Sequence, residues 1–318
     1  MHNPFGAKGW TPSRLPDLTG KTILLTGANT GAGFEATRVL LSKGARVVML
    51  NRNADKSAAA IAALKQEFGA EASVNLITMD LAVLDTVRAA ARTALETVPR
   101  IDALICNAAI AQVAERRLTT DGFESQLGVN HFGHFLLTSL LFGRLHASQG
   151  RVVVVGSNAY KMGLKRIRFE DLNFDHGYSA WNAYAQSKLA QMMFGYELAR
   201  RSHRVGSPVT VFVCHPGASR TNLLKDTASR LNRFVWSTIA PFIAQSAEKG
   251  SWPEVMCATE DGLKAEALYD PTGRMEMVGP VGESPLEPHA LDREAAAKLW
   301  AISEEMTGSA WPELANRA

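Results

Sequence analysis

A glycine-rich turn between a strand and a helix constrains this chain more than any other feature of its sequence. The apolar run 22–25 predicts a buried strand, and the amphipathic run 34–41 predicts the helix that follows. Between them the glycines are spaced G-x-x-x-G-x-G, at Gly27, Gly31 and Gly33. Such a turn lets a pyrophosphate approach the backbone and the free N–H groups that begin the helix. An ordinary tight strand–helix turn is the alternative.

Apolar strands and helices alternate along the rest of the chain. Strands are expected at 46–50, 74–79, 101–106, 151–155 and 209–214, and helices at 56–68, 84–98, 123–145 and 184–202. This alternation predicts an α/β fold, a Rossmann-type doubly wound parallel sheet. We expect a loose N-terminal arm at 1–18 and a single domain over 19–318. A substrate-side extension follows Pro216, with a lid at about 223–262.

Composition and charge exclude several classes of protein. Of 318 residues, 46% are apolar and 20% charged, which supplies a packed core, and the net charge is only +3. The densest basic group, 161–168, is expected to be a solvated loop, so no nucleic-acid partner is predicted. The cysteines Cys106, Cys214 and Cys257 lack C-x-x-C spacing, which favours core residues in a reducing compartment and no metal site.

The sequence also bears on location. The N-terminus has no apolar segment of the kind found in a signal peptide. The apolar run 234–244 is too short to span a bilayer, which needs about 20 residues. We therefore expect a cytoplasmic protein without a transmembrane segment, although surface attachment to a membrane stays open.

Tyr184 and Lys188 lie four residues apart in a predicted helix, so their side chains share a face. A free tyrosine has a pKa of about 10, too high for an efficient base near neutral pH, and a nearby ammonium lowers it. This spacing predicts a tyrosine that acts as general acid or base for a carbonyl/alcohol pair. An amphipathic helix that places both residues there by chance is the alternative.

Three further polar residues accompany the predicted strands. Ser157 follows the strand 151–155, on the ligand side of a parallel sheet, where its hydroxyl could donate to a substrate carbonyl. A helix-capping or turn serine is the alternative. Asn107 ends the strand 101–106, and Asn130 lies in the following helix. Both need hydrogen-bond partners, either as structural ties or as part of a proton relay.

In their order along the chain, these residues resemble the short-chain dehydrogenase/reductases. The resemblance rests on Thr26-Gly27…Gly31…Gly33, Asp80-Leu81, Asn107-Ala108-Ala109, Asn130, Ser157, Tyr184…Lys188 and His215-Pro216-Gly217…Thr221, and covers about residues 18–306. Ala109 stands where the family usually has glycine, and Tyr184 follows Ser157 by 27 residues, more than in the commonest members. The runs 167–173 and 184–190 resemble the retinol dehydrogenase and protochlorophyllide reductase branch. Ala190, where light-dependent protochlorophyllide reductases carry cysteine, counts against that activity.

The resemblance implies a role for each residue. Tyr184 would be the general acid/base, Lys188 would hold the nicotinamide ribose and lower the tyrosine pKa, and Ser157 would polarise the carbonyl. Asn130 would hold a water that links Lys188 to solvent. The expected cofactor-binding residues are Gly27, Asn29, Thr30, Gly31, Gly33, Asn51, Arg52, Asp80, Leu81, Asn107, Ala108, Ala109, Tyr184, Lys188, Pro216, Gly217 and Thr221.

The end of the second strand bears on the choice of dinucleotide. An NAD-type site usually has an acid there for the ribose 2′-hydroxyl, whereas this chain has Asn51, which would not repel a 2′-phosphate. Arg52 follows and could pair with that phosphate through its planar fork. A surface arginine that faces solvent is the alternative. NADP(H) is favoured, and NAD(H) is the second choice.

Together these features predict an NADP(H)-dependent carbonyl reductase or alcohol dehydrogenase for a hydrophobic or aromatic small molecule. The expected substrate lip comprises Asn158, Ala159, Tyr160, Trp181 and residues 223–244, with Phe234, Val235, Trp236, Ile239 and Phe242 as an apolar lid. Core packing or a subunit contact is the alternative for that lid. A cofactor-binding regulatory protein without turnover and a C=C bond reductase stay open as other functions. The resemblance also implies dimers or tetramers, and we expect a homodimer.

Overall fold

The core of the protein is one eight-stranded sheet, seen in a computed structural model that describes residues 3–217 and 245–314. The strand order is β3-β2-β1-β4-β5-β6-β7-β8, parallel except for β8, which pairs antiparallel with β7. The strands are β1 Thr22–Thr26, β2 Arg46–Asn51, β3 Val74–Thr78, β4 Ala103–Cys106, β5 Arg151–Val155, β6 Thr210–Cys214, β7 Leu268–Pro271 and β8 Val281–Ser284. The predicted doubly wound sheet is confirmed, whereas its last two strands, β7 and β8, were not expected.

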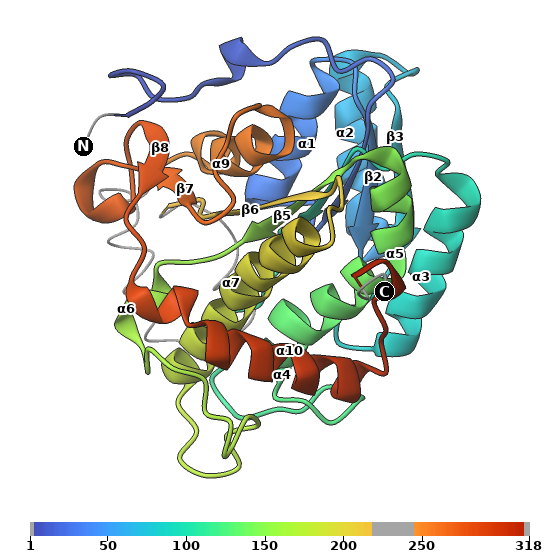
Figure 1. Cartoon of the computed structure of the whole chain (residues 1–318). Helices are drawn as coiled ribbons and strands as arrows, with labels where there is room; N and C mark the ends of the chain where they lie inside the picture. The colour runs from blue at the N-terminus through green and yellow to red at the C-terminus, as the bar shows by residue number, and fades with distance from the viewer. Residues whose placement is uncertain (1–2, 218–244, 315–318) are drawn as a thin grey trace.

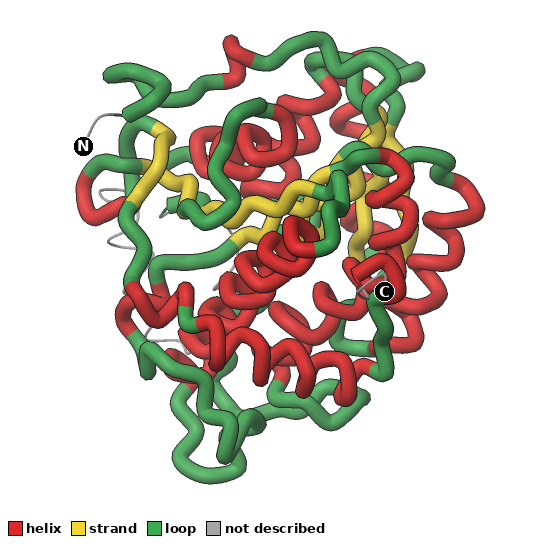
Figure 2. Tube along the Cα trace, in the orientation of Figure 1, coloured by secondary structure: helices red, strands yellow, loops and turns green. Residues whose placement is uncertain are grey.

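Helices cover both faces of the sheet (Figures 1 and 2). The principal helices are α1 Gly31–Leu41, α2 Ala54–Phe68, α3 Leu84–Thr97, α4 Ser125–Leu127, α5 Gly133–Ser148, α6 Ala159–Met162, α7 Ala180–Arg204, α9 Ala247–Thr259 and α10 Arg293–Thr307. One face is covered by α1, α2 and α9, and the other by α3, α5 and α7, with α10 packed outside α7. Every residue of β1 and all but the first of β5 are buried, as a parallel strand between two helical layers requires.

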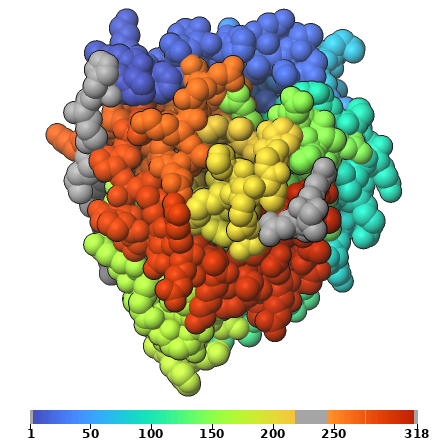
Figure 3. Space-filling model, viewed as in Figure 1, coloured from blue at the N-terminus to red at the C-terminus, as the bar shows by residue number. Residues whose placement is uncertain are grey.

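The N-terminal segment is packed against the domain, so the expectation of a loose arm is wrong for its described residues. Trp10 is fully buried, and its backbone N–H donates to the Val281 carbonyl of β8 at 2.9 Å. Its indole Nε1 donates to Glu260 at 2.7 Å. In Figure 3 this blue segment lies directly against the orange surface that includes α9. The prolines and glycines of this segment shape a packed loop and do not loosen it.

Part of the range expected to form a lid belongs to the core. In α9, Val255, Met256 and Cys257 are fully buried in the apolar layer between this helix and the sheet. The range 247–259 therefore forms a structural helix of the Rossmann layer, which corrects the prediction there. Residues 223–244, with Phe234, Val235, Trp236, Ile239 and Phe242, lie outside the described residues.

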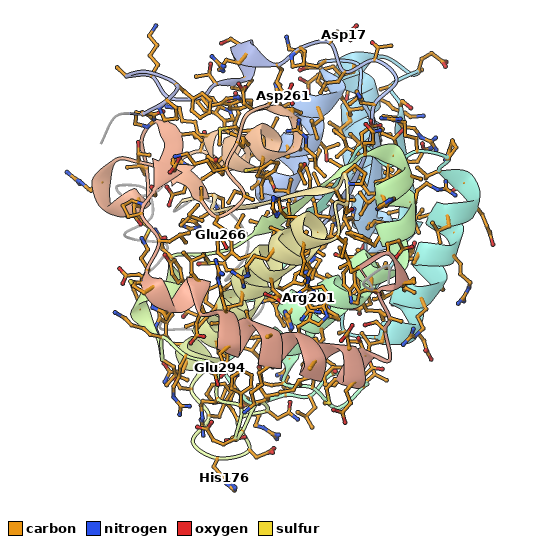
Figure 4. The ribbon with its side chains drawn as sticks, viewed as in Figure 1. Asp17, His176, Arg201, Asp261, Glu266 and Glu294 are labelled. Carbon is orange, nitrogen blue, oxygen red and sulfur yellow. The ribbon has the colours of Figure 1, made fainter. Side chains whose placement is uncertain are left out.

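Many charged side chains of the described residues take part in ion pairs. Arg201 of α7, labelled in Figure 4, donates to Glu197 at 2.7 Å and places its guanidinium 4.4 Å from the ring centroid of Trp300 in α10. In the basic group 161–168, the ion pairs are Lys161 with Glu276, Arg166 with Glu170 and Arg168 with Asp171. Carboxylates therefore neutralise most of that group. Over residues 3–217 and 245–314, no helix is both long enough and apolar enough to cross a bilayer.

Glu254 in α9 generates a prediction about stability. Its two carboxyl oxygens are buried without a hydrogen-bond partner, and burial raises its pKa from 4.5 to about 8. Because an unfolded chain ionises this group at lower pH, the folded protein loses stability as the pH rises from about 4.5 to about 8. We predict that Glu254→Gln raises the free energy of unfolding by about 2 kcal/mol at pH 8 and by much less at pH 5. Urea denaturation at several pH values measures this difference.

The matched control is Glu96→Gln, because Glu96 is exposed on α3. That variant should change the free energy of unfolding equally little at both pH values. An effect of Glu254→Gln that does not grow with pH would contradict the prediction.

Candidate active site

The glycine-rich turn joins β1 to α1 at the centre of the sheet, where the strand order reverses direction. Gly27 and Gly31 have φ of +70° and +60°, which L side chains rarely adopt. A Cβ on Gly33 would lie 2.4 Å from the Gly27 carbonyl oxygen, so only glycine fits there. The turn continues through Asn29 to Thr30, the N-cap residue of α1, and the first turn of that helix has no acidic residue. The residues therefore fit a pyrophosphate, with backbone N–H groups at a helix N-terminus.

Asn107 and Ala108, which follow β4, are hydrogen-bonded to the residues that begin this turn. The Asn107 amide Nδ2 donates to the carbonyls of Thr26 at 2.9 Å and Gly27 at 3.3 Å. The Thr26 hydroxyl accepts from the backbone N–H groups of Asn107 and Ala108, each at 2.9 Å. Ala109 follows, partly exposed. Of the two interpretations of Asn107, the structural tie matches these contacts.

His134 connects the same hydroxyl to the next segment of the site, although the sequence did not single it out. Its Nε2 lies 2.9 Å from Thr26 Oγ1, and its Nδ1 lies 3.0 Å from the Asn130 carbonyl oxygen. A carbonyl only accepts, so Nδ1 carries the proton and Thr26 donates to Nε2. Burial lowers the pKa of His134 to about 4 and keeps the ring neutral. Because α5 is largely apolar, a histidine within it is expected to be an ordinary core residue, so the sequence did not predict a role for His134.

Asn130 lies in a π-helical turn, Gly128–Phe132, between α4 and α5. The single helix expected at 123–145 is therefore interrupted, a feature that often marks functional sites. The side-chain Oδ1 of Asn130 accepts from the Ile110 N–H at 2.9 Å, and Nδ2 donates to Ser187 Oγ at 2.9 Å. Ser187 in turn donates to the Tyr184 carbonyl at 2.8 Å. Asn130 thus fastens the segment after β4 to α7.

Ser157 and Tyr184 lie together at the carboxyl edge of the sheet. Ser157 follows β5 and Tyr184 lies in the first turns of α7, and the Ser157 hydroxyl is near enough to the phenol to affect its pKa. Burial raises the pKa of Tyr184, and the Ser157 hydroxyl opposes that rise. Tyr184 packs with Ala111, Ala159 and Ala185, and the Trp181 ring lies 6.2 Å from the tyrosine ring. The hydroxyl pair therefore sits beside an apolar wall.

Lys188 shares the α7 face with Tyr184 but bonds elsewhere. Its Nζ donates to the Val155 carbonyl at 2.8 Å and to Gln191 Oε1 at 2.9 Å. Burial lowers the pKa of Lys188 to about 7. In this arrangement the shift of the Tyr184 pKa comes from burial and from Ser157, and the Lys188 ammonium is hydrogen-bonded at the end of β5.

The end of β2 differs from the expectation for Asn51. This residue is 3% exposed, its Oδ1 accepts from the Ala28 N–H at 2.8 Å, and its Nδ2 donates to Ser57 at 3.1 Å. It therefore braces the glycine-rich turn and does not present its amide to a ribose. Arg52 is 70% exposed and lies 3.8 Å from the Asp80 carboxylate, a loose surface pair. Leu81, next to Asp80, is buried.

The nicotinamide and substrate end is described in part. Pro216 and Gly217 follow β6, and a Cβ on Gly217 would lie 2.3 Å from the Met277 carbonyl. Thr221 lies outside the described residues. Ala159 and Trp181 border Tyr184 as expected.

Two residues of the expected substrate lip belong to the core instead. Tyr160 is 1% exposed, and its hydroxyl accepts from the Glu287 N–H at 3.2 Å. Asn158 is buried too, with its amide donating to the Glu276 carbonyl at 3.3 Å. The Tyr160 hydroxyl and the Asn158 amide nitrogen therefore bond to the segments after β8 and β7, whereas Asn158 Oδ1 is buried without a hydrogen-bond partner. In the described part of the chain, no group of three His, Cys, Asp or Glu side chains is arranged to hold a metal ion.

Comparison with known proteins places this geometry in a family. The family model for short chain dehydrogenase matches residues 21–169. Retinol dehydrogenase 14 of Mus musculus is 39% identical over 302 residues, covering 92% of this chain and 87% of that protein. Retinol dehydrogenase 13 of Homo sapiens is 37% identical, covering 96% of this chain and 90% of that protein.

Solved structures agree with these relatives. The crystal structure of an uncharacterized protein from Mycobacterium Paratuberculosis has a TM-score of 0.78 at 37% identity, covering 96% of this chain and 99% of that one. A short chain dehydrogenase from Pseudomonas syringae shares the fold, with a TM-score of 0.64 at 24% identity over 82% of this chain and 98% of that one. This chain therefore belongs to the short-chain dehydrogenase/reductase family, in its retinol dehydrogenase-like branch, and is an oxidoreductase.

Proposed function

We propose that this oxidoreductase interconverts a carbonyl and an alcohol with NADP(H), and that Tyr184 is its general acid/base. The observation that carries the proposal is the placement of Ser157 next to Tyr184 beside an apolar wall, at the same edge of the sheet as the glycine-rich turn. When bound, the nicotinamide supplies or accepts the hydride. The chain's own residues orient the substrate and move the proton.

The proton chemistry follows from the two hydroxyls. In reduction, the Tyr184 hydroxyl gives its proton to the substrate oxygen as that oxygen gains negative charge, while the Ser157 hydroxyl donates a hydrogen bond to the same atom. In oxidation, Tyr184 takes the proton back. Burial raises the pKa of Tyr184 and keeps it protonated, which suits the acid role. Approach of the Lys188 ammonium would lower that pKa and suit the base role.

The surroundings of Tyr184 favour a hydrophobic or aromatic substrate. Trp181, Ala111 and Ala159 present little that would bond to a polar substrate near the hydroxyl pair. Two similar mammalian proteins are named retinol dehydrogenases, so retinal and retinol are the first substrates to test. Aromatic ketones and aldehydes similar in width to retinal are the next substrates to test.

The exposed guanidinium of Arg52 favours NADP(H) over NAD(H). It is held only by the loose pair with Asp80 at 3.8 Å, so a 2′-phosphate can compete for it with a planar, doubly hydrogen-bonded contact. We also propose a cytoplasmic location, which fits three buried free thiols, Cys106, Cys214 and Cys257. A homodimer stays a prediction.

Removal of the Tyr184 hydroxyl tests the proposed acid/base. Tyr184→Phe should lower turnover with NADPH and retinal by about 100-fold or more, because no other group delivers the proton at that position. The dissociation constant for NADPH, measured by fluorescence titration, should change little. Tyr178→Phe is the control, because the Tyr178 hydroxyl bonds to the Val113 carbonyl, away from Ser157.

Unchanged turnover in Tyr184→Phe would defeat the assignment. NADPH binding by the unaltered protein without turnover of any carbonyl in the panel would favour a regulatory protein. Turnover of an enone at its C=C bond would favour the reductase alternative.

Arg52→Ala tests the choice of dinucleotide. Loss of a charge-assisted contact to the 2′-phosphate should weaken NADPH binding by about 10-fold or more and leave NADH binding unchanged. Both dissociation constants come from fluorescence titration at fixed ionic strength. Arg117→Ala serves as the control, because Arg117 is a similarly exposed arginine, with 71% side-chain exposure. Equal weakening for NADPH and NADH would refute the role of Arg52.

A further inference from the structure

Gln191 lies one turn beyond Lys188 on α7 and is completely buried. Its Oε1 accepts from Lys188 Nζ at 2.9 Å, and its Nε2 donates to the Cys106 carbonyl, at the end of β4, at 3.3 Å. The other bond of Nζ goes to the Val155 carbonyl, at the end of β5. The ammonium is therefore fixed between the ends of two neighbouring strands, by a side chain that is itself anchored to one of them.

The groups around Lys188 leave its positive charge without a negative partner. The titratable groups that face it are Cys106 on β4, Cys214 on β6, His134 on α5 and His215 after β6, with Tyr184 on its own helix. Burial lowers the pKa of His134 to about 4 and of His215 to about 3, so both rings are neutral near pH 7, and burial holds both thiols protonated. No ion pair among the described residues includes Lys188.

Two neutral oxygens therefore carry the stabilisation of this ammonium, the Val155 carbonyl and the Gln191 amide. The Val155 carbonyl belongs to the backbone of β5, so no side-chain substitution removes it. The amide belongs to a side chain, and it is the part of the arrangement that a substitution can change. A hydrogen-bond acceptor at Nζ favours the charged lysine, whereas burial disfavours it.

We propose that Gln191 is the positioning residue of Lys188, holding its side chain at the ends of β4 and β5 and keeping it charged. The inference rests on the role proposed for Lys188 beside Tyr184. Its consequence is that Gln191 determines both where the Lys188 ammonium rests, at the ends of β4 and β5, and the pH range over which that lysine is charged. Gln191 touches neither hydroxyl of the Ser157–Tyr184 pair in the contacts described, so it acts through Lys188.

Two substitutions change the amide in opposite senses. Gln191→Met keeps the length of the side chain and removes the acceptor, so the titration midpoint of Lys188 should fall by about one pH unit. Gln191→Glu places a carboxylate against Nζ, so the midpoint should rise by about one unit or more. The midpoint is measured on full-length protein labelled with ¹³C-lysine, by NMR across the pH range, with the Lys188 signal identified by its loss in Lys188→Arg.

Gln186→Met is the matched control. Gln186 is a buried glutamine of the same helix, but its Oε1 accepts from the Arg168 N–H at 2.8 Å, away from Lys188. That variant should leave the Lys188 midpoint unchanged. If Gln191→Met does not fold, the nearly isosteric Gln191→Glu carries the test by itself.

The second readout is the pH profile of kcat/KM for NADPH-dependent retinal reduction, which should move in the same direction as the midpoint. A Lys188 midpoint that stays within about 0.3 pH units in Gln191→Glu overturns the proposal, whatever the turnover. Opposite midpoint shifts in the two variants support it. If those shifts appear while the unaltered enzyme turns over no carbonyl, the positioning role stands and the proposed function fails.

Discussion

The buried hydroxyl of Thr26 links the glycine-rich turn to the segment that contacts α7. It accepts hydrogen bonds from two backbone N–H groups just after β4 and donates one to His134 Nε2. His134 Nδ1 in turn donates to the Asn130 carbonyl. Asn130 bonds to Ser187, and Ser187 bonds to the carbonyl of Tyr184. A buried polar group without its partner costs about 1–3 kcal/mol, so each of these residues fixes the next. The glycine-rich turn and Tyr184 are thereby held as parts of one unit.

Burial acts in opposite directions on the two ionisable residues of the site. It raises the pKa of Tyr184 and lowers that of Lys188 to about 7, because in each case the uncharged form is favoured away from water. The two residues share a helix face, but hydrogen bonds to Val155 and Gln191 keep the ammonium from the phenol. The electrostatic environment of the tyrosine therefore depends on where the lysine side chain lies.

Much of the fold was predictable because its strands are continuous apolar runs between turn residues. The strand at 151–155 was predicted with its observed bounds, and β1 with an error of one residue. The last two strands, β7 and β8, were not predicted because the sequences Leu-Tyr-Asp-Pro and Val-Gly-Glu-Ser lack an apolar run. The packing of the N-terminal segment was not predicted either, since the burial of Trp10 depends on Val281 and Glu260, more than 200 residues away.

The sequence by itself determined the features that depend on local geometry. Gly33 is required because a Cβ would strike the turn, and Tyr184 shares a face with Lys188 because a helix repeats every 3.6 residues. Only the tertiary structure decided which partner each polar side chain takes. Asn51 braces the turn, and Lys188 bonds to Val155 and Gln191, because those partners are set by how strands and helices pack. Spacing along one helix fixes which residues can meet, but not which hydrogen bonds a long side chain makes among several acceptors.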